Sequence, residues 1–289
     1  MAGVGWVLET AVRVMEVGAR PTRRAVAAMR SHTPAMFAAT DMARDDAAMD
    51  EGEEAGDEDV MDGPGDLSDD ALRLWRAATA MNAAALARDG GSVSLPPLLF
   101  FTDPQRTPRP WETAARLPAG AAVVYRHFGA VDAADVAGRL RAVTANRGVR
   151  LLIGLDADLA RAAGADGVHL PERALNEAWI LRERHPGWLL TGAAHTVAAA
   201  TTAPGALHAV VLSPIFAAGG ASGAKAALGV DALASAVRGG AGPAYVLPVY
   251  ALGGVNARTV DRLSGAGACG IAGVDALQKA FSGPADLRT

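Results

Sequence analysis

The chain has 289 residues, of which 51% are hydrophobic and 5% aromatic, and its formal net charge is −4 at pH 7. Such a composition supplies enough apolar side chains for one large core or two smaller ones, which excludes a wholly disordered or fibrous protein. The one cysteine, Cys269, cannot form an intramolecular disulfide, and no Cys/His cluster has the spacing of zinc ligands. No run approaches the roughly 18 continuous apolar residues of a membrane span. We therefore expect a cytoplasmic protein without membrane contact.

The charge is distributed unevenly along the chain. Residues 1–40 carry +3, residues 41–70 carry −13 and residues 71–289 carry +6. Residues 41–70 contain few large apolar side chains, and their negative charges repel one another. Such a segment cannot bury enough apolar surface to offset the entropy that it would lose on ordering. Residues 1–66 are therefore predicted to form a disordered acidic tail. The positive charge of the remainder is spread out, with no basic and aromatic run, so no nucleic-acid partner is expected.

The first predicted element is a helix within residues 67–91. Ser68 supplies an N-cap hydroxyl, and Asp69 and Asp70 place negative charge in the first turn, where the helix dipole favours it. The glycines at 90 and 91 end the pattern. One helical stripe is apolar, formed by Leu72, Trp75, Ala78, Met81 and Leu86. We expect this helix to dock on the domain that follows it.

Eight short apolar runs alternate with helical patterns over residues 96–283. The runs are residues 98–101, 122–126, 149–153, 167–170, 188–192, 209–213, 247–252 and 269–273. Helical patterns between them include residues 132–146, 171–183, 196–203 and 256–263. Continuous apolar runs are typical of strands that are buried on both faces, and eight strand and helix units in series favour a closed parallel barrel. The predicted fold is α/β, a (β/α)8 TIM barrel.

Chemistry in such barrels takes place where strands end, so the residues there are the candidates for a site. Arg126 follows the second run, and its guanidinium has the fork geometry that suits a phosphate. His195 follows the fifth run as either a ligand or a hydrogen-bonded structural group. Lys225, in a glycine-rich loop, either clamps a phosphate or is solvated. His169 lies at the end of a buried run and is interpreted as a structural residue, and Cys269 begins a buried run and is interpreted as a packing residue.

Backbone amides after the last two runs suggest a phosphate cradle. Gly253 and Gly254 follow the seventh run, and Gly273 and Val274 open the last helical segment. Amide N–H groups that converge at a helix start bind phosphate in many barrels of this kind. Asp275 would compete with a phosphate for these amides, because its carboxylate could accept their hydrogen bonds or repel the phosphate dianion.

These residues, taken in order, resemble the thiamine phosphate synthase and TenI family over residues 96–282. The similarity is carried by Thr102-Asp103-Pro104, Arg126, residues 164–170 (GADGVHL), His195, Ser213-Pro214-Ile215-Phe216, Leu228-Gly229, residues 251–256 (ALGGVN) and Gly265-Ala266-Gly267. The resemblance implies a synthase that joins a hydroxymethylpyrimidine pyrophosphate to a thiazole phosphate and releases pyrophosphate. It also implies Mg²⁺ on the leaving group, and a thiazole tautomerase activity in the TenI branch.

Several positions depart from the family pattern. The metal-binding aspartate implied after the third run is Leu155, and the carboxylate implied after the fourth run is Ala174. Other polar family positions are occupied by Val124, Phe128, Ala193 and Pro214, the last in place of the TenI histidine. Two explanations remain open for Asp156 and Glu172: they form a displaced metal site, or they serve as a helix N-cap and a helix-dipole partner.

The sequence therefore leaves three functional hypotheses. The first is a synthase in which Arg126, His195 and Lys225 act and the glycine loops hold the monophosphate. The second is a non-catalytic or divergent TenI-like barrel that binds thiamine phosphate or a related phosphate ester. The third is an unrelated sugar-phosphate isomerase on the same fold. All three hypotheses predict a small phosphorylated ligand, and in the first two hypotheses this ligand is a heterocycle. The sequence leaves open whether the protein forms a homo-oligomer.

Overall fold

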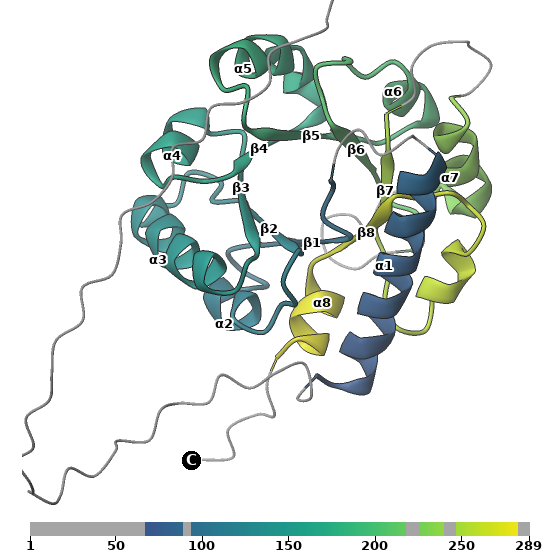
Figure 1. The fold of residues 1–289 in the computed structure, drawn as a ribbon, viewed down its shortest axis with the longest axis horizontal. Coiled ribbons are helices and arrows are strands. Elements are labelled where there is room, and N and C mark those ends of the chain that lie inside the picture. The colour runs from purple at the N-terminus through teal and green to yellow at the C-terminus, as the bar shows by residue number, and fades with distance from the viewer. Residues whose placement is uncertain (1–66, 89–93, 218–225, 240–246, 283–289) are drawn as a thin grey trace, which may run out of the picture. The chain divides into compact units, whose positions relative to one another are not determined.

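The structure, a computed structural model, describes residues 67–88, 94–217, 226–239 and 247–282. The predicted acidic tail of residues 1–66 and the loop residue Lys225 lie outside these ranges. Eight parallel strands close into a barrel in chain order (Figure 1). They are β1 Leu98–Phe101, β2 Ala122–Tyr125, β3 Arg150–Gly154, β4 Gly167–Leu170, β5 Leu189–Ala194, β6 Ala209–Leu212, β7 Val249–Leu252 and β8 Gly270–Gly273. The predicted TIM barrel is confirmed.

Each predicted strand overlaps an observed one, with ends displaced by at most two residues. The seventh strand starts at Val249, directly after Pro248. Proline has no N–H to donate to a sheet, so a strand interior cannot extend through it. This accounts for the difference from the expected start at residue 247.

Helices surround the barrel on its outer face (Figure 1). They are α2 Pro110–Ala114, α3 Ala133–Asn146, α4 Ala157–Ala162, α5 Ala178–Arg184, α6 Val197–Thr201, α7 Gly229–Val237 and α8 Asp275–Ala280, with 3₁₀ turns η2 Glu172–Glu177 and η4 Val260–Leu263. The helix expected over residues 256–263 is reduced to η4. Asn256 Oδ1 accepts from the Arg258 amide, and the Asn256 amide donates to Thr259 Oγ1. Such local side-chain bonds compete with helical ones.

The core has two parts that follow the alternation of side chains along the strands. One part fills the barrel interior and includes Leu99, Phe101, Val124, Leu152, Val211 and Tyr250. The other lies between the strands and the surrounding helices and includes Phe100, Val123, Leu151, Val168, Leu190 and Ile271. Because both faces of every strand are covered, the runs are apolar throughout. Within the described ranges, no helix is both long and apolar enough to cross a membrane.

The predicted N-terminal helix is α1, Asp69–Arg88, and it packs beside β8 and α8 (Figure 1). Ser68 Oγ accepts from the Ala71 amide at 3.2 Å, as an N-cap does, and donates to the Ala280 carbonyl at 2.8 Å. Near the other end, the side-chain nitrogen of Asn82, Nδ2, donates to the carbonyls of Leu95 and Cys269 at 3.2 and 2.9 Å. These bonds connect α1 to the chain just before β1 and β8.

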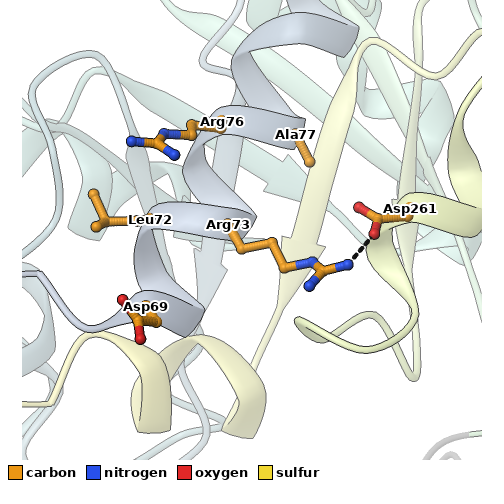
Figure 2. A pocket seen from close by; sticks show the side chains of 6 residues that line it. All are labelled: Asp69, Leu72, Arg73, Arg76, Ala77 and Asp261. Atoms are coloured by element: carbon orange, nitrogen blue, oxygen red, sulfur yellow. Dashed lines mark hydrogen bonds and ion pairs between the residues drawn. The ribbon is translucent and has the colours of Figure 1, made fainter.

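An open hollow of about 580 Å³ lies between α1 and η4 (Figure 2). Arg73 of α1 forms an ion pair with Asp261 of η4 across it. The remaining lining residues are Asp69, Leu72, Arg76 and Ala77. Two arginines and two aspartates balance in charge, and none of these residues follows the carboxyl end of a strand. We therefore place the candidate functional site elsewhere, at the barrel mouth.

Candidate functional site

Arg126 follows β2 and is anchored in the barrel mouth by the loop after β1. Its amide donates to Thr102 Oγ1 at 2.9 Å, and its Nε donates to the Thr102 carbonyl at 2.8 Å. The nearest carboxylate oxygen, on Asp103, lies 3.9 Å from a terminal nitrogen, beyond hydrogen-bond distance. Among the described residues, neither terminal nitrogen of Arg126 donates a hydrogen bond. These donors are therefore available to an anionic ligand.

The surroundings of Arg126 are apolar on two sides. Its guanidinium carbon lies 5.4 Å from the ring centre of Phe101 and 5.3 Å from that of Phe128. A Cβ at Gly154 would lie 3.2 Å from Arg126 Cγ, so the glycine leaves room for the arginine. Burial lowers the pKa of Arg126 while Asp103 raises it, yet an arginine keeps its charge throughout the physiological range. A partly desolvated cation is a strong site for a phosphate.

His169, on β4, is buried inside the same end of the barrel. Its Nδ1 lies 2.9 Å from Thr191 Oγ1, and its ring meets Phe101 edge to face at 4.9 Å. Burial, with a smaller contribution from the positive charge of Arg126, lowers the pKa of His169 to about 3. The imidazole is therefore neutral at physiological pH and cannot serve as a general acid there.

The depressed pKa of His169 predicts a loss of stability in acid. Between pH 6.5 and 3 the unfolded chain binds a proton at this residue and the folded chain does not, so the free energy of unfolding falls as the pH falls. From pH 6.5 to 4 the loss from this residue should be about 3 kcal/mol. Urea unfolding of wild type and His169→Gln across this range measures it. The variant should have the shallower dependence on pH, and parallel curves would contradict the prediction.

His195 follows β5 and is held from two directions. Its amide donates to Glu172 Oε2 at 2.7 Å, and its ring Nδ1 lies 3.1 Å from the Ser213 carbonyl oxygen. The same ring nitrogen lies 3.2 Å from Ser213 Oγ, so Ser213 contacts it with both its backbone and its side chain. The structure thus orients the imidazole at the strand ends, as a positioning role requires.

Gly253 and Gly254 form the turn after β7 with φ values of 96° and 64°. A Cβ on Gly253 would lie 2.7 Å from Pro214 Cα, and one on Gly254 would lie 2.4 Å from the Ala217 carbonyl oxygen. Both positions therefore require glycine on conformational and steric grounds. Neither amide donates a hydrogen bond to any residue that the structure describes, which leaves both N–H groups available to a ligand.

Gly273 ends β8, and Val274 is the N-cap position of α8. The competition expected from Asp275 for these amides is not observed, because among the described residues the hydrogen bonds to its carboxylate come from Arg106. Instead, Asp275 is paired with Arg106, whose Nε donates to Oδ1 at 2.7 Å while a terminal nitrogen contacts Oδ2. This contact raises the pKa of Arg106. The negative charge of Asp275 is thereby partly neutralised.

Comparison with known proteins identifies the family. The family model described as thiamine monophosphate synthase matches residues 98–277, more than half of the chain. The chain belongs to the thiamine monophosphate synthase family. A thiamine-phosphate synthase of Methanoculleus marisnigri is 36% identical over 148 residues, which are 50% of this chain and 67% of that protein. The solved structure of thiamine phosphate pyrophosphorylase from Pyrococcus furiosus has the same fold, with a TM-score of 0.52. The two sequences are 21% identical, and the match covers 64% of this chain and 91% of the Pyrococcus furiosus chain.

The Mg²⁺ implied by thiamine monophosphate synthase membership requires oxygen ligands that converge. Asp156 Oδ1 instead accepts from the Leu159 amide at 2.8 Å as the N-cap of α4, and Glu172 Oε2 is occupied by the His195 amide. In the ranges that the structure describes, no three His, Cys, Asp or Glu residues are grouped so that they could hold a metal ion. These residues do not fit a magnesium site. The N-cap interpretation of Asp156 is confirmed.

The structure brings most of the predicted site of this thiamine monophosphate synthase family member to one rim. Arg126, His195 and the glycine loops all follow strand ends, whereas Lys225 lies outside the described residues. Sequence reasoning missed Arg106. It belongs to no apolar run or motif, and only the meeting of the β1 loop with α8 shows its role.

Proposed function

We propose that this protein is a thiamine phosphate synthase-like enzyme that joins a hydroxymethylpyrimidine pyrophosphate to a thiazole phosphate and releases pyrophosphate. Family membership supports this reaction class. The observation that carries the proposal is the partly buried Arg126, whose terminal nitrogens have no hydrogen-bond acceptor among the described residues. A phosphorylated substrate supplies the acceptors that this guanidinium lacks.

In this reaction the bond between the pyrimidine methylene carbon and the pyrophosphate oxygen breaks, and a bond from that carbon to the thiazole nitrogen forms. Arg126 would contact a phosphate group of the substrate with its two terminal nitrogens. His195, fixed through Ser213 and Glu172, would orient the substrate. The amides of Gly253, Gly254, Gly273 and Val274 would hold the thiazole monophosphate. Lys225 would contribute a further cation.

A second function is favoured by one specific observation, the poor fit of the described residues to a metal. Leu155 and Ala174 provide no oxygen ligand where the family pattern implies carboxylates, and no alternative cluster replaces them among the described residues. On this ground the alternative is a barrel that binds a phosphate ester of the thiamine pathway without turning it over. Both functions use the same anion site.

Two measurements separate the functions. The first is pyrophosphate release from the pyrimidine pyrophosphate and the thiazole phosphate, with MgCl₂ and with EDTA; the second is the thermal shift of the protein with thiamine phosphate. Release at a steady rate supports the synthase. A thermal shift without release selects the binding protein. Absence of both responses would contradict both functions. The cytoplasmic location, the absence of a nucleic-acid partner and the oligomeric state stay predictions.

A further inference from the structure

Two apolar side chains are exposed beside Arg126, on the loops after β2 and β3. Phe128 is 70% exposed and Leu155 is 39% exposed. Both residues have left-handed backbone conformations, with φ values of 49° and 66°. Large side chains rarely adopt this region, which costs on the order of 1 kcal/mol or more per residue. The chain thus keeps two apolar residues in an unfavourable conformation at the entrance of the site.

Hydrogen bonds on both sides of these residues maintain that conformation. The Leu155 amide donates to the His169 carbonyl at 2.9 Å. The Gly129 amide donates to His127 Nδ1 at 3.1 Å, and His127 Nε2 lies 3.5 Å from Asp156 Oδ2. Because His127 precedes Phe128 and Asp156 follows Leu155, this contact connects the two loops directly. The exposed pair is therefore built into the rim.

We propose that Phe128 and Leu155 form an apolar shelf for the ring of a phosphate monoester, and that the mouth binds this ligand without a divalent metal. The inference deepens the proposed function, on which it rests, by specifying how the mouth recognises its substrate. The guanidinium of Arg126 already lies 5.3 Å from the centre of the Phe128 ring, so an anion on Arg126 places the rest of the ligand near the shelf.

The chemistry of the shelf selects between two kinds of phosphorylated ligand. A pyrophosphate bound through a metal needs carboxylate or amide oxygens near it, and Leu155 has none. A monophosphate can instead pair directly with the guanidinium fork and the backbone amides. The apolar ring then gains contact area with Phe128 and Leu155, and a ring stacked on an aromatic side chain contributes about 0.5–1.5 kcal/mol. The thiazole phosphate has this combination of groups.

The test is isothermal titration calorimetry of the full chain with the thiazole phosphate and with inorganic phosphate, each in EDTA and in MgCl₂. For wild type we expect the Kd for the thiazole phosphate to differ by less than about twofold between the two buffers. Phe128→Ala should weaken binding of the thiazole phosphate about tenfold and leave that of inorganic phosphate unchanged. Leu155→Asn is a second variant, because asparagine tolerates the left-handed backbone and removes the apolar contact.

Trp179→Ala is the matched control, since Trp179 is 60% exposed and lies on α5 rather than at a strand end. Its affinity for the thiazole phosphate should equal that of wild type. Binding that is more than tenfold tighter in MgCl₂, or Phe128 and Leu155 variants that bind like wild type, would overturn the shelf while leaving the proposed function intact. Absence of thiazole phosphate binding in both buffers, together with no pyrophosphate release, would overturn both.

Discussion

Replacing Arg126 by methionine is expected to weaken binding of the thiazole phosphate about 100-fold. Loss of one partner from a partly buried, charge-assisted hydrogen-bond pair typically costs about 2–5 kcal/mol. The Arg126 side chain is only 27% exposed, so water cannot fully replace its contacts with a phosphate. Methionine retains an apolar stem and removes the charged fork, whose central carbon lies over the rings of Phe101 and Phe128. Calorimetric titration of both proteins measures the change.

Arg141→Met is the matched control for this substitution. Arg141 lies on α3 and donates to Asp166 at 2.8 Å, just before β4 begins and therefore at the opposite end of the barrel from the mouth. Its exposure, 33%, is close to that of Arg126. Binding should be unchanged in this variant. If the two variants lose affinity equally, the effect comes from general loss of structure and the assignment of Arg126 fails.

Gly167→Ala should produce the largest loss of stability, more than about 3 kcal/mol. A Cβ at Gly167 would lie 2.0 Å from the Leu189 carbonyl oxygen and 2.7 Å from its backbone nitrogen. Residues 167 and 189 are paired in β4 and β5, so the obstructing atoms are sheet backbone that cannot move without breaking the ladder. Overpacking of a core usually costs about 1–3 kcal/mol even where side chains can adjust. Urea unfolding followed by circular dichroism measures the difference.

Gly138→Ala is the corresponding control, because Gly138 lies inside α3 and a Cβ there would meet nothing within 4 Å. Alanine has the higher helix propensity and lowers the entropy of the unfolded chain, so this variant should gain about 0.5–1 kcal/mol. The two glycine variants should therefore shift the urea midpoint in opposite directions. A loss at position 138, or no loss at position 167, would show that the local backbone contacts do not control these substitutions.

Much of the barrel was predictable because its signals are local. Strands that are covered on both faces need continuous apolar side chains, and the run at residues 167–170 coincides with β4. The N-cap at Ser68 was recognisable for the same reason, since the cap and the amide that it accepts from, on Ala71, are three residues apart. The position of Arg126 after a strand then followed from the topology alone.

The details of the site depended on contacts between distant parts of the chain. Asp275 was expected to compete for the phosphate amides, but Arg106, 169 residues earlier, pairs with its carboxylate. The exposure of Phe128 and Leu155 results from loop conformations that the His127 to Asp156 contact and the bond to His169 maintain. The sequence around Phe128 and Leu155 does not indicate that His127 meets Asp156 or that the Leu155 amide bonds to His169.

The order and type of the elements, and the rim at which their loops meet, could be read from the chain because periodic burial and helix capping act over a few neighbouring residues. The pairing of charges at that rim depends instead on contacts that form when the barrel closes. Asp275 is paired with Arg106 from the loop after β1, whereas the terminal nitrogens of Arg126 have no hydrogen-bond acceptor among the described residues. The reason is physical: a charge interacts with whatever the closed barrel places within a few ångströms, and that neighbourhood exists only after the first and last strands have met.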